Sequence, residues 1–541
     1  MDNHKPRSKF WFVFFILFSI WFSVLYCFDW SSLPGLSSFS QKSLQSLDSN
    51  PIQESSDPNP IPKSDDVPHD KNQTMASDAN HKPNNVSTMD DTIENLERLQ
   101  VKEEEEENGV EKGRTRKPCT GRYIYVQDIP TRFNDDYIKS CKLLNKWHHM
   151  CPYFDNMGLG QKLGNPQRLF SRTGWYVTHQ FSLEVIFHNR MKQYESIFVP
   201  YYSGLDISRY LFDSYNTSIK DADSLELFRL LKGKPEWNVM NGRDHFLVCG
   251  RITWDFRRAV DTDSEWGNKL MILPESQSIT MLTIESSPWD KNDFAIPYPT
   301  YFHPSNDDQV YERQNKMRRQ RRRTLFCFAG APRPNMDGSI RGEIMAQCTA
   351  ARQKCKMMEC KNDKHNCLKP VNVMKMFQNS VFCLQPPGDS FTRRSTFDSI
   401  LAGCIPVFFT PGSAYVQYLW HLPKEYSSYS VLIPEGDVKQ KKVSIDNVLS
   451  KISKSRISEM REQVIKLIPK VIYADPRSRL NKLEDAFDLT VKGVIERVEK
   501  LKREMREGRS YNDEFDSEIS WKYYSFGTTE QHEWDHYFKR N

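Results

Sequence analysis

The stretch Ser380–Thr410, SVFCLQPPGDSFTRRSTFDSILAGCIPVFFT, decides the expected fold because it passes from a strand pattern through a turn to a helix and a second strand. Val381–Leu384 is an apolar run of strand length, and Pro386–Gly388 end it. A second buried strand is expected at Ile405–Phe409. The pattern predicts a βαβ unit whose loop lies at the carboxyl end of a strand, where open α/β sheets bind their ligands.

A helix is expected between these two strands. Its start is predicted near three residues of N-capping type, Asp389, Ser390 and Thr392. Three apolar residues then recur at the spacing that buries one helical face, namely Phe397, Ile400 and Leu401. Gly403 stands where a helix C-terminus favours glycine, so the helix should end just before it.

The loop before this helix has the composition of a phosphate site. A helix N-terminus carries free N–H groups and partial positive charge. Arg393 and Arg394 add guanidinium groups that fit phosphate oxygens, and Asp398 is one turn away, placed to accept hydrogen bonds from ribose hydroxyls. We therefore predict a nucleotide or nucleotide-sugar site. The alternative is an ordinary βα crossover with a solvated arginine pair and a capping aspartate.

The amino-terminal region has the pattern of a type II membrane anchor. Basic residues in a cytoplasmic tail, 1–9, precede an apolar segment, 10–28, that is long enough to span a bilayer. No small-residue cleavage site follows it, although a cleaved signal peptide is the alternative. Residues 29–118 are polar and proline-rich, which predicts a disordered lumenal stem. Glycosylation sequons begin at Asn72, Asn85 and Asn216.

From Cys119 onward the chain is globular and long enough for two domains. We expect a first domain at 119–310, a second at 320–500 and a tail at 501–541, with the basic run Arg318–Arg323 as a solvated linker or hinge. The net charge of +5 is small for this length and argues against a nucleic-acid partner. Two consecutive βα domains predict two Rossmann-like domains facing a cleft.

Individual elements are expected from short apolar runs. In the first domain we predict a helix at 174–191 and strands at 123–126, 196–200, 244–248 and 270–273. In the second domain we predict strands at 324–328, 381–384, 405–409 and 431–433.

The sequence contains 12 cysteines, and Cys27 lies in the predicted membrane span, which leaves eleven in an oxidising lumen that favours disulfides. Because eleven is odd, at least one of them is expected to stay free or to pair between chains. One cluster comprises Cys348, Cys355, Cys360 and Cys367, and a second near pair comprises Cys141 and Cys151. A zinc site is the alternative for the cluster because His365 lies within it. The spacing lacks the paired knuckles of zinc sites, so disulfides are predicted. Cys383 and Cys404, on neighbouring predicted strands, are interpreted as buried thiols.

Several motifs together resemble the plant branch of the exostosin family of glycosyltransferases. They are CLQPPGDSFTRRSTFDSILAGCIPVFF, FAGAPRPNMDGSIRGEI, GRDHFLVCGRITWDFRR, IPYPTYFHP and TGWYVTHQFSLEVIFHNRMKQYE. The likeness covers about residues 117–510, and within the family the chain is similar to the xyloglucan galactosyltransferases.

The resemblance implies a GT-B fold, Golgi residence and inverting transfer of galactose from UDP-galactose to xylose side chains of xyloglucan, giving a β-linkage. A close sub-branch transfers galacturonic acid instead, and the motifs do not separate the two. The implied partners are the donor, the xyloglucan acceptor and the Golgi membrane, with other xyloglucan-synthesising enzymes as further candidates. Neither an essential metal nor a cofactor besides the UDP-sugar substrate is implied.

Donor binding is expected to use two strand ends. Around the arginine pair the candidate residues are Gly388, Asp389, Ser390, Arg393, Arg394, Ser395 and Asp398. Gly330 follows the predicted strand 324–328 and would allow close backbone approach. Arg341 is a second candidate contact for the leaving diphosphate, with a surface ion pair as the alternative. Internal pairing with Arg394 is the alternative for Asp398.

A general base must accept the proton of the acceptor hydroxyl. Asp206 follows a glycine turn at a strand end, Asp244 and His245 form a carboxylate–imidazole pair, and Glu184 lies in a predicted helix. A structural role is the alternative for each. The aromatic residues that could stack on sugar rings, or else pack in the core, are Trp175, Tyr201, Tyr202 and Trp254.

Two other functions fit parts of the sequence. A metal-dependent GT-A transferase needs an Asp-x-Asp motif after a strand. Asp221-Ala-Asp223 and Asp261-Thr-Asp263 match the pattern, but neither ends a hydrophobic strand, so both are interpreted as caps and surface loops. An inactive Golgi scaffold is the second alternative, and the intact arginines and Asp398 argue against it.

Overall fold

The computed structural model describes residues 125–146, 149–163, 174–191, 197–212, 214–336, 338–360, 367, 369–508 and 534–538. The predicted anchor, the stem and the sequons at Asn72 and Asn85 lie outside these ranges. Within them, no helix combines the length and the apolar character that crossing a membrane requires.

The first half of the described chain contains a parallel three-stranded sheet in the order β1-β2-β3. Its strands are β1 (Phe246–Ile252), β2 (Thr280–Glu285) and β3 (Asp293–Ala295). Nearly all of their residues are buried, so both faces of the sheet are covered, and β2 buries the polar residues Thr280, Thr283 and Glu285 among apolar ones. The helices of this half are α3 (Asp135–Lys139), α4 (Cys151–Gly158), α5 (Leu183–Met191), α6 (Ser203–Ser208), α7 (Thr217–Lys232) and α8 (Pro235–Met240).

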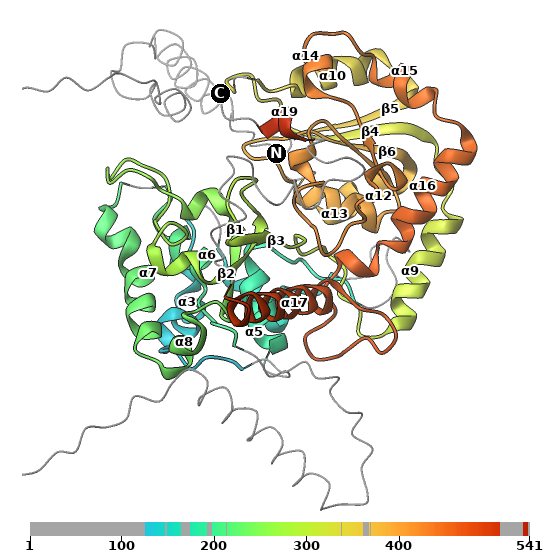
Figure 1. The fold of residues 1–541 in the computed structure, drawn as a ribbon. Coiled ribbons are helices and arrows are strands. Elements are labelled where there is room, and N and C mark those ends of the chain that lie inside the picture. The colour runs from blue at the N-terminus through green and yellow to red at the C-terminus, as the bar shows by residue number, and fades with distance from the viewer. Residues whose placement is uncertain are drawn as a thin grey trace, which may run out of the picture. The chain divides into compact units, whose positions relative to one another are not determined.

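The second half contains a parallel five-stranded sheet in the order β5-β4-β6-β7-β8. Figure 1 labels β5, β4 and β6 in this half. Its strands are β4 (Thr324–Gly330), β5 (Cys355–Glu359), β6 (Ser380–Gln385), β7 (Ile405–Phe408) and β8 (Val431–Leu432). The helices are α9 (Asp307–Arg319), α10 (Arg341–Ala350), α12 (Pro370–Asn379), α13 (Arg394–Leu401), α14 (Glu435–Lys439), α15 (Ile445–Ser450), α16 (Lys454–Lys466), α17 (Ala486–Arg506) and α19 (Asp535–Phe538). The two parallel sheets with their helices confirm the predicted α/β class.

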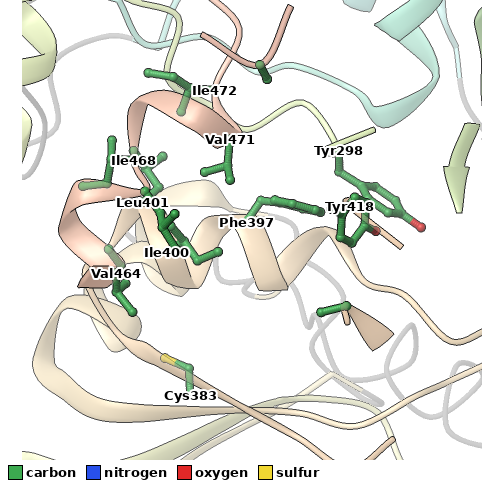
Figure 2. Close-up of a cluster of buried hydrophobic side chains, with 14 of the residues drawn as sticks. Tyr298, Cys383, Phe397, Ile400, Leu401, Tyr418, Val464, Ile468, Val471 and Ile472 are labelled. Carbon is green, nitrogen blue, oxygen red and sulfur yellow. The ribbon is translucent and has the colours of Figure 1, made fainter. Parts of the chain in front are cut away.

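Helix α13 and its flanking strands confirm the predicted βαβ unit. Phe397, Ile400 and Leu401 are fully buried, and Figure 2 shows them within the same apolar cluster as Val464 and Val471. Burial of side chains of this size contributes about 1.5–3 kcal/mol each. Gly403 ends the helix with a φ of +61°, the left-handed conformation predicted for this position.

Helix α17 follows the second half in sequence but contacts the first half. Its capping residue Asp485 accepts a 2.6 Å hydrogen bond from Arg190 of α5. Arg497 donates to the hydroxyl of Thr280 at the start of β2, and α17 is drawn across the first half in Figure 1. The predicted domain limit at residue 500 is therefore not a packing boundary.

Several predicted elements of the first half were wrong. The segment 270–273 forms turns, and the neighbouring strand is β2, because apolar periodicity alone does not distinguish a buried turn from a strand. In the described residues, the predicted strands 123–126 and 196–200 reduce to isolated bridges from Phe198 to Val126 and to Phe246 of β1. The predicted helix 174–191 is α-helical only from Leu183, because Trp175 and Tyr176 form β-bridges. The glycine turn expected before Asp206 is part of helix α6, and Asp206 lies within that helix.

The cysteine cluster is paired into disulfides as predicted. The bridges are Cys141–Cys151, Cys348–Cys355, Cys360–Cys367 and Cys383–Cys404. The cluster therefore retains no thiolate for zinc. The last bridge corrects the interpretation of Cys383 and Cys404 as thiols: neighbouring strands bring them together. Cys249 and Cys327 are buried free cysteines.

The basic run Arg318–Arg323 is not a solvated linker throughout. Arg318 and Arg319 end α9. Arg322 turns inward and donates to the carbonyl groups of Phe377, Ser380 and Ala402. Burial lowers the pKa of Arg322 to about 9. Arg322 thus satisfies backbone carbonyls at the ends of α12 and α13.

Candidate functional site

The second sheet has a topological switch point at β4. The strand after β4 in sequence, β5, lies on one side of it, and β6 lies on the other. The loops that leave the carboxyl ends of β4 and β6 therefore diverge, and such a position binds ligands in open α/β sheets. These loops lead into α10 and α13, so two helix N-termini accompany the switch point.

Arg341, the first residue of α10, joins the two loops. Its Nε donates to the carbonyl of Pro387 at 3.1 Å, and its Nη1 lies 3.3 Å from the carbonyl of Ala331. The side chain is 7% exposed, so the alternative of a surface ion pair is wrong. Forty-six residues of sequence separate Arg341 from Pro387.

Arg393 lies directly against Gly388. A Cβ atom on Gly388 would fall 1.1 Å from Nη2 of Arg393 and 2.7 Å from Nη2 of Arg341. The lack of a side chain at Gly388 therefore lets both guanidinium groups approach the same loop. Gly330 has a different explanation, because its Cβ would meet the ring of Phe328 at 2.7 Å.

Arg394 occupies the first turn of α13 and reaches the first half of the chain. Its Nη1 donates to the carbonyl of Thr178 at 2.5 Å, and its guanidinium carbon lies 3.8 Å from the ring centroid of Tyr301. Nε lies 3.8 Å from a carboxylate oxygen of Asp398. The ion pair with Arg394, which was the alternative to a ribose-binding role for Asp398, is therefore present.

The arginine side chains retain unused hydrogen-bonding capacity. Nε and Nη2 of both Arg393 and Arg394 are buried and have no hydrogen-bond partner among the described residues, and the same holds for Oδ1 of Asp398. Buried polar groups are normally satisfied. A ligand that supplies oxygens to the guanidinium groups would satisfy them.

The electrostatics of these arginines indicate an excess of positive charge. Burial lowers the pKa of Arg341 to about 10, and the nearby charges of Arg393 and Arg333 add to this effect. Burial also lowers the pKa of Arg393. Asp389 is exposed and pairs with Arg333 at 3.2 Å. An anion bound here would relieve the repulsion between the guanidinium groups.

Helix α13 starts slightly later than predicted. Its capping residue is Arg393, whose side chain makes no capping hydrogen bond, whereas Asp389, Ser390 and Thr392 all precede the cap. The backbone carbonyl of Ser390 accepts a hydrogen bond from the N–H of Gly388. The residues of capping type therefore shape the loop, and the N–H groups of the first turn receive no side-chain cap.

Thr392 is held by a residue that the sequence analysis missed. Glu285, at the carboxyl end of β2, accepts hydrogen bonds from the backbone N–H and the hydroxyl of Thr392 at 2.7 and 2.6 Å. Its other oxygen accepts from Nε1 of Trp254 at 3.1 Å. Glu285 is fully buried. A carboxylate that ends an apolar strand is the signal that could have identified it, but strand β2 itself was not predicted.

Ser395 and Gln385 complete the local contacts of α13. The hydroxyl of Ser395 donates to Oε1 of Gln385 at 2.6 Å. The structure thus brings together the candidate donor residues Arg341, Gly388, Arg393, Arg394, Ser395 and Asp398 around one helix start.

Two of the candidate bases are buried carboxyl groups with protein partners. Asp206 accepts from the hydroxyl of Tyr201 at 2.6 Å and pairs with Arg209, and burial raises its pKa to about 6. Glu184 accepts from the backbone N–H groups of Gly204 and Leu205 at the start of α6, and burial raises its pKa to about 8. Their described hydrogen bonds connect both residues to α6 and its neighbours rather than to the arginine cluster.

Asp244 and His245 form the predicted pair, with 2.8 Å between Oδ1 and Nδ1. They precede β1, so they lie at the amino end of a parallel strand. Glu285, in contrast, lies at the carboxyl end of the neighbouring strand and contacts the α13 loop. The pair is thus at the opposite sheet edge from that contact, and its catalytic role stays a prediction without a supporting contact.

Three of the four carboxylates in the Asp-x-Asp motifs have arginine partners within the protein. Asp221 and Asp261 both accept from Arg258, and Asp223 pairs with Arg209 at 3.1 Å. Asp263 accepts from the backbone N–H of Thr217. Asp221 and Asp223 lie within α7, so their prediction as a helix cap is wrong, and both pair with arginines instead. Asp261 and Asp263 lie in an exposed loop, as predicted.

Asn216, the one predicted glycosylation residue within the described ranges, is exposed and precedes α7. Its side chain makes no capping hydrogen bond to the helix. The position is accessible, and its glycosylation stays a prediction.

Comparison with known proteins identifies relatives across most of the chain. Residues 118–449 match the model of the Exostosin GT47 domain. The chain is similar to "Xyloglucan galactosyltransferase MUR3" of Arabidopsis thaliana, with 52% identity over 437 residues, 78% of this chain and 70% of that protein. It is 51% identical over 416 residues to "Probable xyloglucan galactosyltransferase GT12" of the same plant, covering 74% and 81% of the two chains. "Xyloglucan-specific galacturonosyltransferase 1", also of Arabidopsis thaliana, is 40% identical over 394 residues, 71% and 58% of the two chains.

Proposed function

The chain belongs to the exostosin GT47 family, and from this premise we propose that it transfers galactose from UDP-galactose to xylose side chains of xyloglucan. The names of the more similar relatives support galactose as the donated sugar. The relative named for galacturonic acid is less similar, at 40% identity against 52%. The reaction is an inverting transfer that forms a β-linkage.

The observation that carries the proposal is the set of guanidinium groups at the switch point of the second sheet. Departure of UDP from the donor places negative charge on the diphosphate, and positive groups held in place stabilise that charge. Arg341, Arg393 and the uncapped first turn of α13 supply such groups. Unpartnered buried N–H groups of Arg393 fit oxygen ligands.

Arg394 and Asp398 extend this site toward the remainder of the nucleotide. Asp398 has an unused carboxylate oxygen that suits a ribose hydroxyl. Arg394 is positioned by the carbonyl of Thr178, which belongs to the first half. A movement of the two halves toward a bound donor would therefore change the position of Arg394 through its contact with Thr178, as expected for a GT-B arrangement.

The proposed reaction uses arginines in place of a divalent metal. The charge on the diphosphate is compensated by guanidinium forks. The carboxylates of the Asp-x-Asp motifs instead compensate Arg258 and Arg209. In the cell the enzyme is proposed to act in the Golgi lumen, held by the anchor at residues 10–28, with the UDP-sugar as its donor and xyloglucan as its acceptor.

The test is transfer by the full-length chain in detergent. Xyloglucan oligosaccharides are incubated with UDP-galactose, UDP-galacturonic acid or UDP-glucose in separate reactions, each with and without EDTA, and the products are weighed by mass spectrometry. We expect a hexose added from UDP-galactose alone and an equal rate in EDTA. A product only from UDP-galacturonic acid would assign the other donor. No product from any donor would favour the scaffold alternative.

A further inference from the structure

Two tryptophans differ from the others in their exposure. Among the tryptophans whose side chains the structure describes, only Trp254 and Trp266 are more than one third exposed, at 39% and 47%. Both follow the carboxyl end of β1. The other aromatic residues considered for sugar stacking, Trp175, Tyr201 and Tyr202, are at most 3% exposed and belong to the core. Trp254 is therefore the one candidate of that set whose ring is open to a ligand.

Each exposed indole is anchored through its N–H group to a buried carboxylate. Nε1 of Trp254 donates to Glu285 at 3.1 Å, and Nε1 of Trp266 donates to Asp255 at 2.6 Å. Both carboxylates are at most 2% exposed, and Asp255 is itself held by Nε of Arg251 at 2.5 Å. An indole fixed by its edge keeps its ring face in one orientation, so little conformational entropy is lost when a ligand binds.

Trp254 is also connected to the donor site. Glu285, which anchors its N–H, accepts two hydrogen bonds from Thr392, the residue before Arg393. The ring of Trp289 contacts Trp254 edge to face, with 6.0 Å between the ring centroids. Trp266 in turn contacts the exposed ring of Phe212 at 5.6 Å. Trp254 is thus connected to the donor loop, and Trp266 is connected to Asp255, the residue that follows Trp254.

We propose that Trp254 and Trp266 form a binding platform for the pyranose rings of the neutral oligosaccharide acceptor. The inference rests on the proposed function and assigns the acceptor site of the same enzyme. Pyranose rings present apolar C–H faces that pack on aromatic rings. A neutral chain needs no charged partner, and the nearby carboxylates Asp255 and Glu285 are occupied by arginine, tryptophan and threonine donors.

The location favours a sugar chain over a protein partner. The acceptor hydroxyl must reach the sugar attached to the diphosphate, so part of the acceptor has to lie beside the α13 loop. Trp254 satisfies this requirement through Glu285 and Thr392. A protein docking on the same rings would obstruct the approach to that loop.

The platform is tested by equilibrium binding without donor. The full-length chain in detergent is titrated with a xyloglucan oligosaccharide by isothermal titration calorimetry, and separately with UDP. Trp254→Ala and Trp266→Ala are compared with the wild type and with Tyr311→Ala. Tyr311 lies on α9 and is 39% exposed, so this control removes an aromatic ring of equal exposure away from the platform.

We expect Trp254→Ala to raise the Kd for the oligosaccharide about tenfold, as loss of one buried ring contact predicts. Trp266→Ala should raise it as well, and Tyr311→Ala should leave it unchanged. Trp254→Phe keeps a ring but loses the N–H anchor, so it should fall between the wild type and Trp254→Ala. UDP should bind all variants alike, which also shows that they are folded.

Wild-type Kd values for the oligosaccharide in both alanine variants would overturn the platform, as would a wild-type chain that binds no oligosaccharide. Equal weakening by Tyr311→Ala would also overturn it. The proposed function can be rejected independently of the platform. If the wild-type chain binds the oligosaccharide through these tryptophans but transfers no galactose, the platform is supported and the proposed function is rejected. If both alanine variants transfer galactose at the wild-type rate and with the wild-type KM for the oligosaccharide, the proposed function is supported and the platform is rejected.

Discussion

Substitution of Gly388 by alanine tests the donor site without removing any charged group. The new methyl group would fall 1.1 Å from Nη2 and 2.0 Å from Cζ of Arg393, and 2.7 Å from Nη2 of Arg341. Carbon and nitrogen atoms in contact are separated by about 3.5 Å, so the guanidinium group of Arg393 must move by about 2 Å. Gly388 does not have a positive φ, so the substitution adds no backbone strain of the left-handed kind.

The expected loss follows from the bond that Arg393 would make to the diphosphate. A hydrogen bond to a charged group contributes about 1.5–3 kcal/mol, which corresponds to a loss of about 10- to 150-fold in kcat/KM. Displacement of Arg341 as well would move the result toward the upper end. Because the loop is only partly buried, the free energy of unfolding should change by less than about 1 kcal/mol.

The assay measures kcat/KM for UDP-galactose and the Kd for UDP, with Gly436→Ala as the matched control. A Cβ on Gly436 would meet nothing within 4 Å, so this variant should behave as the wild type. A double-mutant cycle with Arg393→Ala isolates the mechanism, because Gly388→Ala should add little once the guanidinium group is gone. A Gly388→Ala enzyme with wild-type Kd for UDP, or full additivity in the cycle, would refute the assignment of Arg393 as a phosphate ligand.

Three further predictions concern the same site. Arg394→Lys keeps the charge but loses the planar fork that holds Thr178, so kcat/KM should fall at least tenfold; a smaller loss in steady-state kinetics would contradict this role. Burial raises the pKa of Asp398 to about 6, so this carboxyl becomes protonated as the pH falls through 6, and the affinity for UDP measured by calorimetry should decline there. In Asp398→Asn the affinity for UDP should not change over the same pH range. A decline that persists in this variant would assign the titration to another group. Glu285→Gln leaves Thr392 and Trp254 with one fewer acceptor oxygen, so the KM for UDP-galactose should rise with a folded protein by circular dichroism; an unchanged KM would reject Glu285 as a positioning residue.

The sequence alone determined the βαβ unit around α13 and its likeness to a glycosyltransferase family. The apolar spacing of Phe397, Ile400 and Leu401 and the glycine at 403 act over one or two helical turns. The geometry of helices and strands sets this short-range periodicity, so it can be recognised in the sequence without knowledge of the tertiary structure. Cysteines close in sequence, such as Cys141 and Cys151, were predicted for the same reason.

Only the tertiary structure decided which residues meet at the site. Glu285 and Thr392 are 107 residues apart, and Arg394 and Thr178 are 216 apart. The order of strands in a sheet sets these encounters, and no local pattern encodes that order, because it depends on which elements bury one another's apolar faces. For the same reason Glu184 and Asp206 received buried partners on α6, and a tryptophan at the end of β1 received both an anchor and an open ring face.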